Sequence, residues 1–129
     1  MADAPRKRVL VVDDAALVRL FYRGALEQGG FEVAEALNGV EALEKLVEGP
    51  VDLLVVDVNM PQMDGLTFVA SVRKRALPLA ATPVLITSTE SGPQDFAAAR
   101  TAGANFYLTK PVSPEQLAEY ARLLCGVAA

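Results

Sequence analysis

Three carboxylates and one lysine stand directly after short apolar runs of the chain. Asp13 and Asp14 follow VLVV, Asp57 follows VDLLVV and Lys110 follows FYLT. Short aliphatic runs bounded by turn residues are typical of buried parallel strands, and open α/β sheets bind ligands beyond the carboxyl ends of their strands. If these strands are neighbours, the three acids meet at one edge with a cation beside them. Such a cage suits a divalent metal ion and a transferable phosphoryl group.

The three acids need a counter-charge, because neighbouring carboxylates cannot all stay ionised cheaply. Mg²⁺ prefers oxygen ligands and is usually held by one or two carboxylates together with phosphate oxygens and water. We expect Asp14 and Asp57 to be direct ligands and Asp13 to act through a bound water. A turn or capping role would be the better interpretation of Asp57 alone. Two adjacent acids, however, exceed what capping needs.

A hydroxyl and the lysine strengthen the phosphoryl interpretation. The run PVLI is followed by Thr87, whose hydroxyl is well placed to donate to a phosphoryl oxygen. Lys110 would bind phosphate as a compact point charge, although a surface lysine at a strand end is an ordinary alternative. The acid pair, the single acid, the hydroxyl and the lysine on four sheet ends are hard to produce by chance.

Apolar runs alternate with amphipathic segments five times. The strand-like runs lie near 8–12, 31–36, 51–57, 83–88 and 105–109, and the helical patterns near 15–28, 39–48, 65–76, 93–102 and 113–125. This alternation predicts βαβ units and a parallel sheet. The first and third runs are the most apolar and should be central, whereas the second alternates apolar and acidic residues and should be an edge. The pattern alone does not fix which strands are adjacent, but a doubly wound, flavodoxin-like α/β sheet of five parallel strands in the order 2-1-3-4-5 satisfies it.

Helix faces and helix ends fit the same plan. Asn38 and Asp64 are predicted N-caps, and Ser113 begins a capping box with proline at the first helical position. An amphipathic helix packs its apolar stripe on the core. The predicted stripes are Leu17, Leu20, Phe21 and Gly24 in the first helix and Leu117, Tyr120, Ala121 and Leu124 in the last.

The composition indicates one domain, residues 1–129, with a core from about 8 to 125. Of the 129 residues, 52% are hydrophobic, which argues against disorder, and the net charge of −4 argues against nonspecific nucleic-acid binding. The first apolar run is too short for a signal peptide or a membrane span. Cys125 is the only cysteine and histidine is absent, so an internal disulfide and a Cys–His nucleophile are excluded and a cytoplasmic location is expected.

Taken together, these motifs resemble the receiver domains of two-component response regulators. The resemblance spans roughly Arg8 to Cys125 and rests on VVDD at 11–14, VVDVNMPQMDG at 55–65, ITS at 86–88 and LTKP at 108–111. Each motif is modest by itself, but the set with its spacing is highly specific. The 2-1-3-4-5 strand order is a known property of chemotaxis receivers, so the resemblance implies it as well.

The resemblance implies a role for each site residue. Asp57 would be the phosphoacceptor, which takes a phosphoryl group from a histidine kinase or phosphotransfer protein. Asp13 and Asp14 would be the Mg²⁺-binding pair, and Asn59 would supply a backbone carbonyl to the metal. Lys110 would neutralise phosphoryl charge, and its bond to Pro111 is typically cis in the family. The protein would catalyse only its own phosphorylation and dephosphorylation, so we do not expect an enzyme in the usual sense.

The resemblance also implies a switch. Thr87 would bond the phosphoryl group and shift on activation, and Tyr107 would change its rotamer in response. The downstream protein target would then meet a face made of the fourth helix near 94–100, the strand around Tyr107 and the start of the fifth helix near Glu115. The chain ends soon after its last helix, so we expect a stand-alone, monomeric receiver without an output domain.

Several other interpretations stay open at this point. A Mg²⁺-dependent aspartyl phosphatase of the haloacid-dehalogenase type wants a second Asp two residues after its nucleophile, where this chain has Asn59. An FMN-binding module shares the fold, but Asp13 and Asp14 would repel its phosphate. A degenerate receiver that switches without phosphate is disfavoured by the intact set of acids, hydroxyl and lysine. A stand-alone receiver could also act as a phosphate relay or sink.

Overall fold

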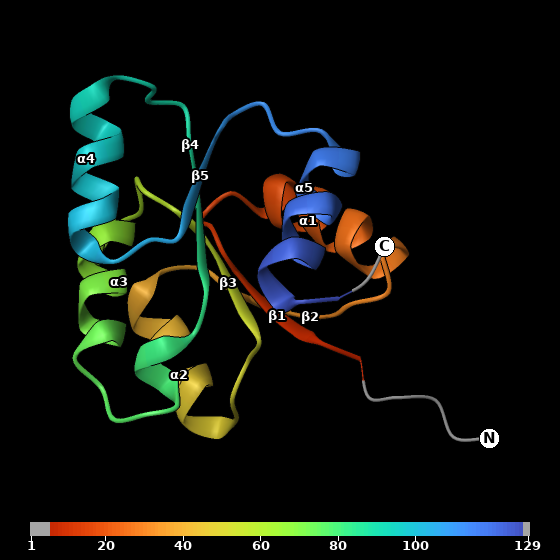
Figure 1. The fold of residues 1–129 in the computed structure, drawn as a ribbon, viewed down its shortest axis with the longest axis horizontal. Coiled ribbons are helices and arrows are strands. Elements are labelled where there is room, and N and C mark those ends of the chain that lie inside the picture. The colour runs from red at the N-terminus through yellow and green to blue at the C-terminus, as the bar shows by residue number, and fades with distance from the viewer. Residues whose placement is uncertain (1–5, 128–129) are drawn as a thin grey trace.

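The apolar runs form one five-stranded parallel sheet with helices on both faces (Figure 1). The structure is a computed structural model and describes residues 6–127. The elements in chain order are β1 Arg8–Val12, α1 Ala16–Gln28, β2 Glu32–Ala36, α2 Gly39–Glu48, β3 Leu53–Asp57, α3 Gly65–Arg73, a 3-10 turn Leu79–Ala81, β4 Val84–Ser88, α4 Pro93–Ala102, β5 Phe106–Thr109 and α5 Pro114–Cys125.

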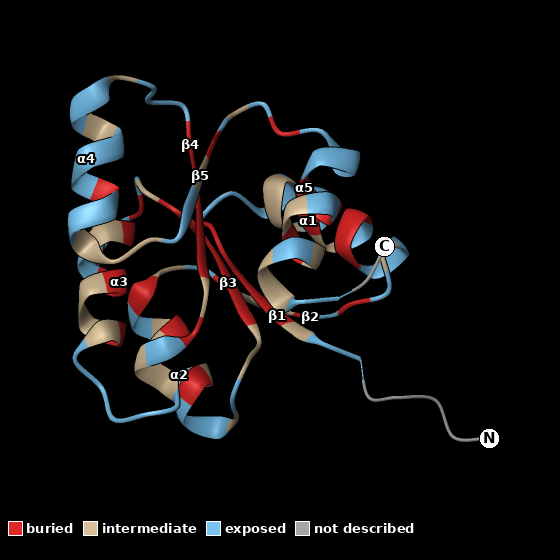
Figure 2. Ribbon diagram, in the orientation of Figure 1, coloured by how far each residue is buried: buried red, intermediate tan, exposed pale blue. Residues whose placement is uncertain are grey.

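The strand order is β2-β1-β3-β4-β5, which confirms the predicted fold. β2 is an edge strand, as its alternating acidic residues indicated. β3 and β4 are buried along their whole length, because both of their faces are covered by helices (Figure 2). The register pairs Val12 with Val56 and Asp57 with Thr87, so the residues that follow β1 and β3 leave the sheet side by side.

Two apolar clusters fill the two sides of the sheet, because successive strand residues point to opposite faces. Val9, Val55 and Leu85 point toward α1 and α5. Their chain neighbours Leu10, Val56 and Ile86 point toward α2, α3 and α4. The two helical layers lie on opposite sides of the strands in Figure 1. The sheet therefore divides the interior into an α1/α5 side and an α2/α3/α4 side.

The predicted apolar stripe of α1 is wrong. Leu17 and Leu20 are 80% and 64% exposed, and Phe21 is also exposed. The helix instead buries Tyr22, Ala25 and Leu26 against the sheet and α5. Two apolar stripes run along this helix, and packing against α5 selects the second. The predicted stripe of α5 is confirmed, because Leu117 and Ala121 are fully buried and Tyr120 and Leu124 pack against the same cluster.

The predicted helix starts are confirmed by side-chain hydrogen bonds. Asn38 accepts from the amide of Glu41, Asp64 accepts from that of Thr67 and Ser113 accepts from that of Gln116. These bonds satisfy amides that have no partner within the first helical turn. No helix among residues 6–127 is long and apolar enough to cross a bilayer.

Gly65 sets the position of α3 relative to the end of β3. A Cβ added there would overlap the backbone carbonyl of Asp57, whereas a Cβ added to Gly24, on the exposed side of α1, would meet nothing within 4 Å. Gly65→Ala should therefore lower the free energy of unfolding by about 1–3 kcal/mol, the range of overpacking. Gly24→Ala should raise it by about 0.5–1 kcal/mol, because glycine is a poor helix former.

Urea unfolding of both variants at pH 7 measures the two effects. Both substitutions add one methyl group, at the start of α3 and in the middle of α1, so opposite signs would distinguish close packing at Gly65 from helix propensity at Gly24. Equal changes in both variants would show that α3 does not depend on this close approach.

Candidate phosphoryl-transfer and metal site

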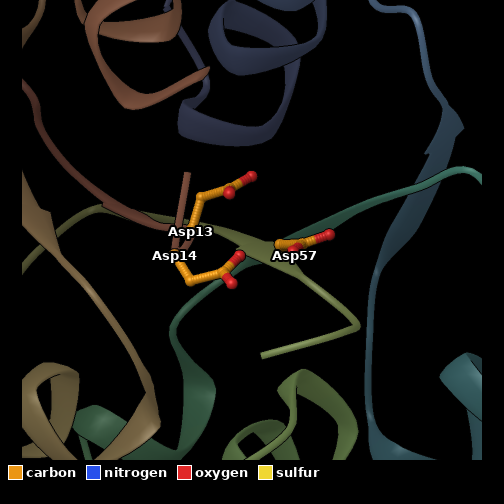
Figure 3. A group of neighbouring side chains, drawn as sticks. All are labelled: Asp13, Asp14 and Asp57. Atoms are coloured by element: carbon orange, nitrogen blue, oxygen red, sulfur yellow. The ribbon is translucent and has the colours of Figure 1, made fainter. Parts of the chain in front are cut away.

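The three predicted carboxylates meet at the carboxyl edge of the sheet. One oxygen each from Asp13, Asp14 and Asp57 lie within 4.8 Å of one another. Figure 3 shows the side chains side by side, two from the end of β1 and one from the end of β3. Asp13 and Asp57 are only 1% and 7% exposed, whereas Asp14 is exposed. The group therefore has two buried acids with a third on its open side.

Lys110 bridges the two buried acids. Its Nζ lies 3.1 Å from Oδ2 of Asp13 and 3.2 Å from Oδ1 of Asp57. The backbone amide of Lys110 also donates to the Ser88 carbonyl at 2.7 Å, which continues the pairing of β5 with β4 beyond Thr109. The bond between Lys110 and Pro111 is cis, as predicted. A second cis bond, Leu77–Pro78, was not predicted.

The electrostatics of the site follow from this burial. Burial raises the pKa of Asp57 above its ordinary value, and the charge of Asp13 raises it further, while Lys110 acts in the opposite direction. Burial would lower the pKa of Lys110, but the hydrogen bonds and charges of Asp13 and Asp57 outweigh it and leave that pKa raised. The site thus holds a firmly protonated ammonium beside a carboxylate whose negative charge is not fully compensated.

The donor set fits a hard divalent cation. Mg²⁺ takes oxygen ligands and dehydrates reluctantly, so it suits a site with two carboxylates at its floor and one on its open side. Asn59 lies in the exposed segment after β3, on the chain that leaves Asp57. The segment is held by the amide of Gly65, which donates to the Val58 carbonyl at 2.8 Å. The structure therefore brings the three acids together and leaves Asn59 on the adjoining loop.

Thr87 is completely buried at the end of β4, beside Asp57 in the register. Tyr107 lies on the other side of the sheet, where its ring meets Phe96 edge-on with ring centroids 4.7 Å apart. Its hydroxyl donates to the Glu90 carbonyl at 2.7 Å. The predicted switch residues thus occupy opposite faces of the sheet and are connected through the loop from β4 to α4.

Two residues beside the site were missed in the sequence. Arg19 donates to the Asp13 carbonyl at 2.7 Å and pairs with Glu35 of β2 at 3.0 Å, which ties the end of β1 to α1 and β2. Tyr22 is 3% exposed, and its pKa responds to site residues. The sequence offered one signal for Tyr22, namely a side chain with a polar hydroxyl on an otherwise apolar stripe of α1.

Residues 9–122 match the family described as response regulator receiver domain. The chain belongs to this family. Receiver domains are signalling switches of two-component systems and bind Mg²⁺ at an acidic pocket, which corresponds in this receiver to the group of Asp13, Asp14 and Asp57. A receiver of this type implies an interaction with a histidine kinase or a phosphotransfer protein.

Individual relatives agree with the family. The receiver is 37% identical to chemotaxis protein CheY1 of Helicobacter pylori over 121 residues, which cover 92% of this chain and 97% of that protein. It is 41% identical to the transcriptional regulatory protein PrrA of Mycobacterium bovis over 104 residues, 81% of this chain but 43% of that longer protein. The solved structure of CheY4 from Vibrio cholerae superimposes with a TM-score of 0.87 at 35% identity and covers 93% of this chain and 99% of that one.

The raised pKa of Asp57 predicts a pH-dependent effect of removing its charge. At pH 7 without Mg²⁺, ionised Asp57 costs the folded state free energy, so Asp57→Asn should raise the free energy of unfolding. The gain should shrink as the pH falls through the pKa of Asp57, because the wild-type carboxyl then becomes neutral as well. Urea titrations of both proteins between pH 7 and acid measure the difference.

Glu44→Gln is the matched control, since Glu44 is an exposed carboxylate of α2. It should change stability little at any pH. A destabilised Asp57→Asn at pH 7 would show that Lys110 compensates the charge of Asp57 fully.

Proposed function

We propose that this receiver is a phosphorylation-dependent switch and that Asp57 is its only phosphoacceptor. The carrying observation is the position of Asp57, at the end of a buried central strand between the acid pair and the Thr87 hydroxyl. A carboxylate oxygen of Asp57 would attack the phosphorus of a phosphohistidine. A P–O bond forms as the P–N bond breaks, and the donor keeps its histidine. The product is an acyl phosphate, which the receiver later hydrolyses.

The surrounding residues support this transfer through position and charge. Phosphoryl transfer needs in-line placement and neutralisation of charge more than covalent assistance. Lys110 would offset the charge on the phosphoryl oxygens, and the Thr87 hydroxyl would donate to one of them. Asp13, Asp14, Asp57 and the Asn59 carbonyl would hold Mg²⁺, which supplies further charge neutralisation when bound.

A protein phosphodonor is favoured by the surface next to the site. α1 begins two residues after Asp14, and the wrongly predicted stripe of this helix presents Leu17, Leu20 and Phe21 to solvent. Exposed apolar side chains grouped beside an active site are typical of a protein contact. A histidine kinase or phosphotransfer domain that covers α1 would bring its phosphohistidine to Asp57.

The output face is favoured by a groove on the opposite side of the sheet. The groove has a volume of about 520 Å³ and lies between α4 and β5, where Phe96, Arg100 and Tyr107 line it. α4 buries only Ala99, so little packing opposes its movement. Phosphorylation would draw Thr87 toward the phosphoryl group, shift the loop after β4 and release Tyr107 from Glu90. A protein target would read the changed face of α4, β5 and α5.

The rival functions lack a comparable observation. Position 59 offers an amide where a haloacid-dehalogenase-type phosphatase wants its second acid. The acid pair after β1 would repel the phosphate of FMN. A relay or sink would use the same acceptor chemistry without the output switch. A monomer in the cytoplasm is the setting that we propose, with no nucleic-acid partner.

Acceptor chemistry predicts one labile phosphoryl group. Incubation with acetyl phosphate and Mg²⁺ should add a single phosphoryl group by intact mass, and hydroxylamine should remove it because acyl phosphates react with this nucleophile. Asp57→Asn should abolish the adduct, and a chelator should do so in the wild type. Asp52→Asn is the control, since Asp52 accepts a hydrogen bond from the Arg8 amide at the start of β1, far from the site. This variant should take up one phosphoryl group as the wild type does. An adduct that persists in Asp57→Asn would overturn the assignment.

The switch predicts that Thr87 transmits the signal without being needed for acceptance. Thr87→Ala should still take a phosphoryl group, more slowly, but should lose most of the response of the output face. Amide NMR shifts of α4 and β5 on addition of Mg²⁺ and beryllofluoride, a phosphoryl analogue, measure that response. Thr109→Ala, which alters an exposed hydroxyl at the end of β5, is the control and should respond as the wild type does. A full response in Thr87→Ala would show that the signal takes another route.

A further inference from the structure

Tyr22 is a buried phenol that the proposed chemistry does not use. It lies on α1, is 3% exposed and belongs to the apolar cluster on the α1/α5 side of the sheet, together with Leu85 and Leu108. A buried tyrosine ordinarily contributes apolar area and finds a partner for its hydroxyl. The neighbours of this hydroxyl therefore decide whether Tyr22 is only a core residue.

Strand alternation places Thr87 on the same side as Tyr22. Leu85 points toward α1 and α5, and Ile86 points the other way, so Thr87 points toward α1 and α5 again. The same alternation along β3 directs Asp57 to this side, two residues after Val55. The acceptor, the switch hydroxyl and the Tyr22 ring therefore share one side of the sheet.

The Thr87 hydroxyl needs a partner. It is fully buried, and among residues 6–127 its Oγ1 accepts and donates no hydrogen bond with good geometry. A buried hydroxyl without a partner destabilises the fold, so side-chain rotations that supply a partner are favoured. Tyr22 is the buried residue of α1 that carries a hydroxyl on this side of the sheet.

The protonation of Tyr22 reports the same proximity. Burial raises the pKa of the phenol, the Thr87 hydroxyl and the charge of Lys110 lower it, and the charges of Asp13 and Asp57 raise it. These effects place the phenol near the Thr87 hydroxyl and near the charges of Lys110, Asp13 and Asp57. No hydrogen bond joins the two hydroxyls in the structure, and a torsional change of either side chain would be needed to form one.

We propose that Tyr22 is a positioning residue that holds the Thr87 hydroxyl in the unphosphorylated state. A threonine hydroxyl has one proton to donate. The Tyr22 oxygen and a phosphoryl oxygen on Asp57 therefore compete for the same proton. Tyr22 keeps Thr87 withdrawn until a phosphoryl group takes the proton, and so sets the threshold of the switch.

This inference rests on the proposed function, because it assumes a phosphoryl group on Asp57. Tyr22→Phe removes the competing oxygen and keeps the ring, so it should tighten binding of beryllofluoride with Mg²⁺ by about 2- to 10-fold, the worth of one neutral hydrogen bond. Thr87→Val removes the switch hydroxyl but keeps the shape of the side chain. In this background Tyr22→Phe should change the affinity for beryllofluoride less than 2-fold, since no Thr87 hydroxyl remains for Tyr22 to hold.

Calorimetric titration of beryllofluoride at saturating Mg²⁺ measures the four proteins of this cycle, and urea unfolding measures their stability. Tyr120→Phe is the matched control, because Tyr120 is a half-buried tyrosine of α5 whose ring meets Phe106 edge-on, away from the site. Its affinity should equal that of the wild type. A purely structural role of Tyr22 would change stability and would act equally in both Thr87 backgrounds.

The outcomes separate the two levels of the argument. Tighter binding in Tyr22→Phe that disappears with Thr87→Val supports the competition. Unchanged or weaker binding in Tyr22→Phe, or an equal effect in both Thr87 backgrounds, overturns the role of Tyr22. The proposed function would still stand in that case, provided that the wild type binds beryllofluoride. A wild-type chain that binds no beryllofluoride overturns the proposed function itself.

Discussion

The site depends on the burial of two like charges, Asp13 and Asp57, around the ammonium of Lys110. At an effective dielectric constant of 20, unit charges 4 Å apart interact by about 4 kcal/mol, which is comparable to the net stability of a small domain. A single lysine cannot offset three carboxylates within 4.8 Å of one another. The folded chain thus keeps an excess of negative charge that a divalent cation can neutralise. The rest of the structure positions the three carboxylates that carry this charge.

The parallel sheet meets this demand with little backbone adjustment. Its central strands are apolar on both faces, so their hydrogen-bonded register is protected from water up to the last residue. Asp13, Asp57 and Lys110 continue the alternation of β1, β3 and β5 toward α1 and α5. Arg19 holds the end of β1 and Gly65 admits α3 close to Asp57. The buried strands therefore fix the positions of the site residues at the carboxyl edge of the sheet.

The same alternation imposes a route on any signal. Asp57 and Thr87 face α1 and α5, whereas Tyr107 and α4 lie across the sheet. Because β4 is packed on both faces, we propose that the loop from β4 to α4 would carry such a movement. In that loop Ser88 accepts from the Glu90 amide at 3.0 Å, and the Glu90 carbonyl accepts from Tyr107. Among the five α-helices of residues 6–127, α4 buries the fewest residues, so its packing opposes movement least.

Local sequence determined the strands, the helix caps and the group of acids with Lys110, because these depend on short apolar runs, turn chemistry and the shared carboxyl edge of parallel strands. The strand order was predicted only with the help of the family resemblance, because local patterns do not say which strands are neighbours. The core-facing stripe of α1 could not be determined in this way. Leu17, Leu20 and Phe21 are as apolar as the stripe with Tyr22, Ala25 and Leu26, and only packing against α5 and the sheet chooses between them. The tertiary structure thereby decided that apolar side chains border the site and that the Tyr22 phenol is buried on the same side of the sheet as Thr87, since both depend on the rotation of one helix about its axis.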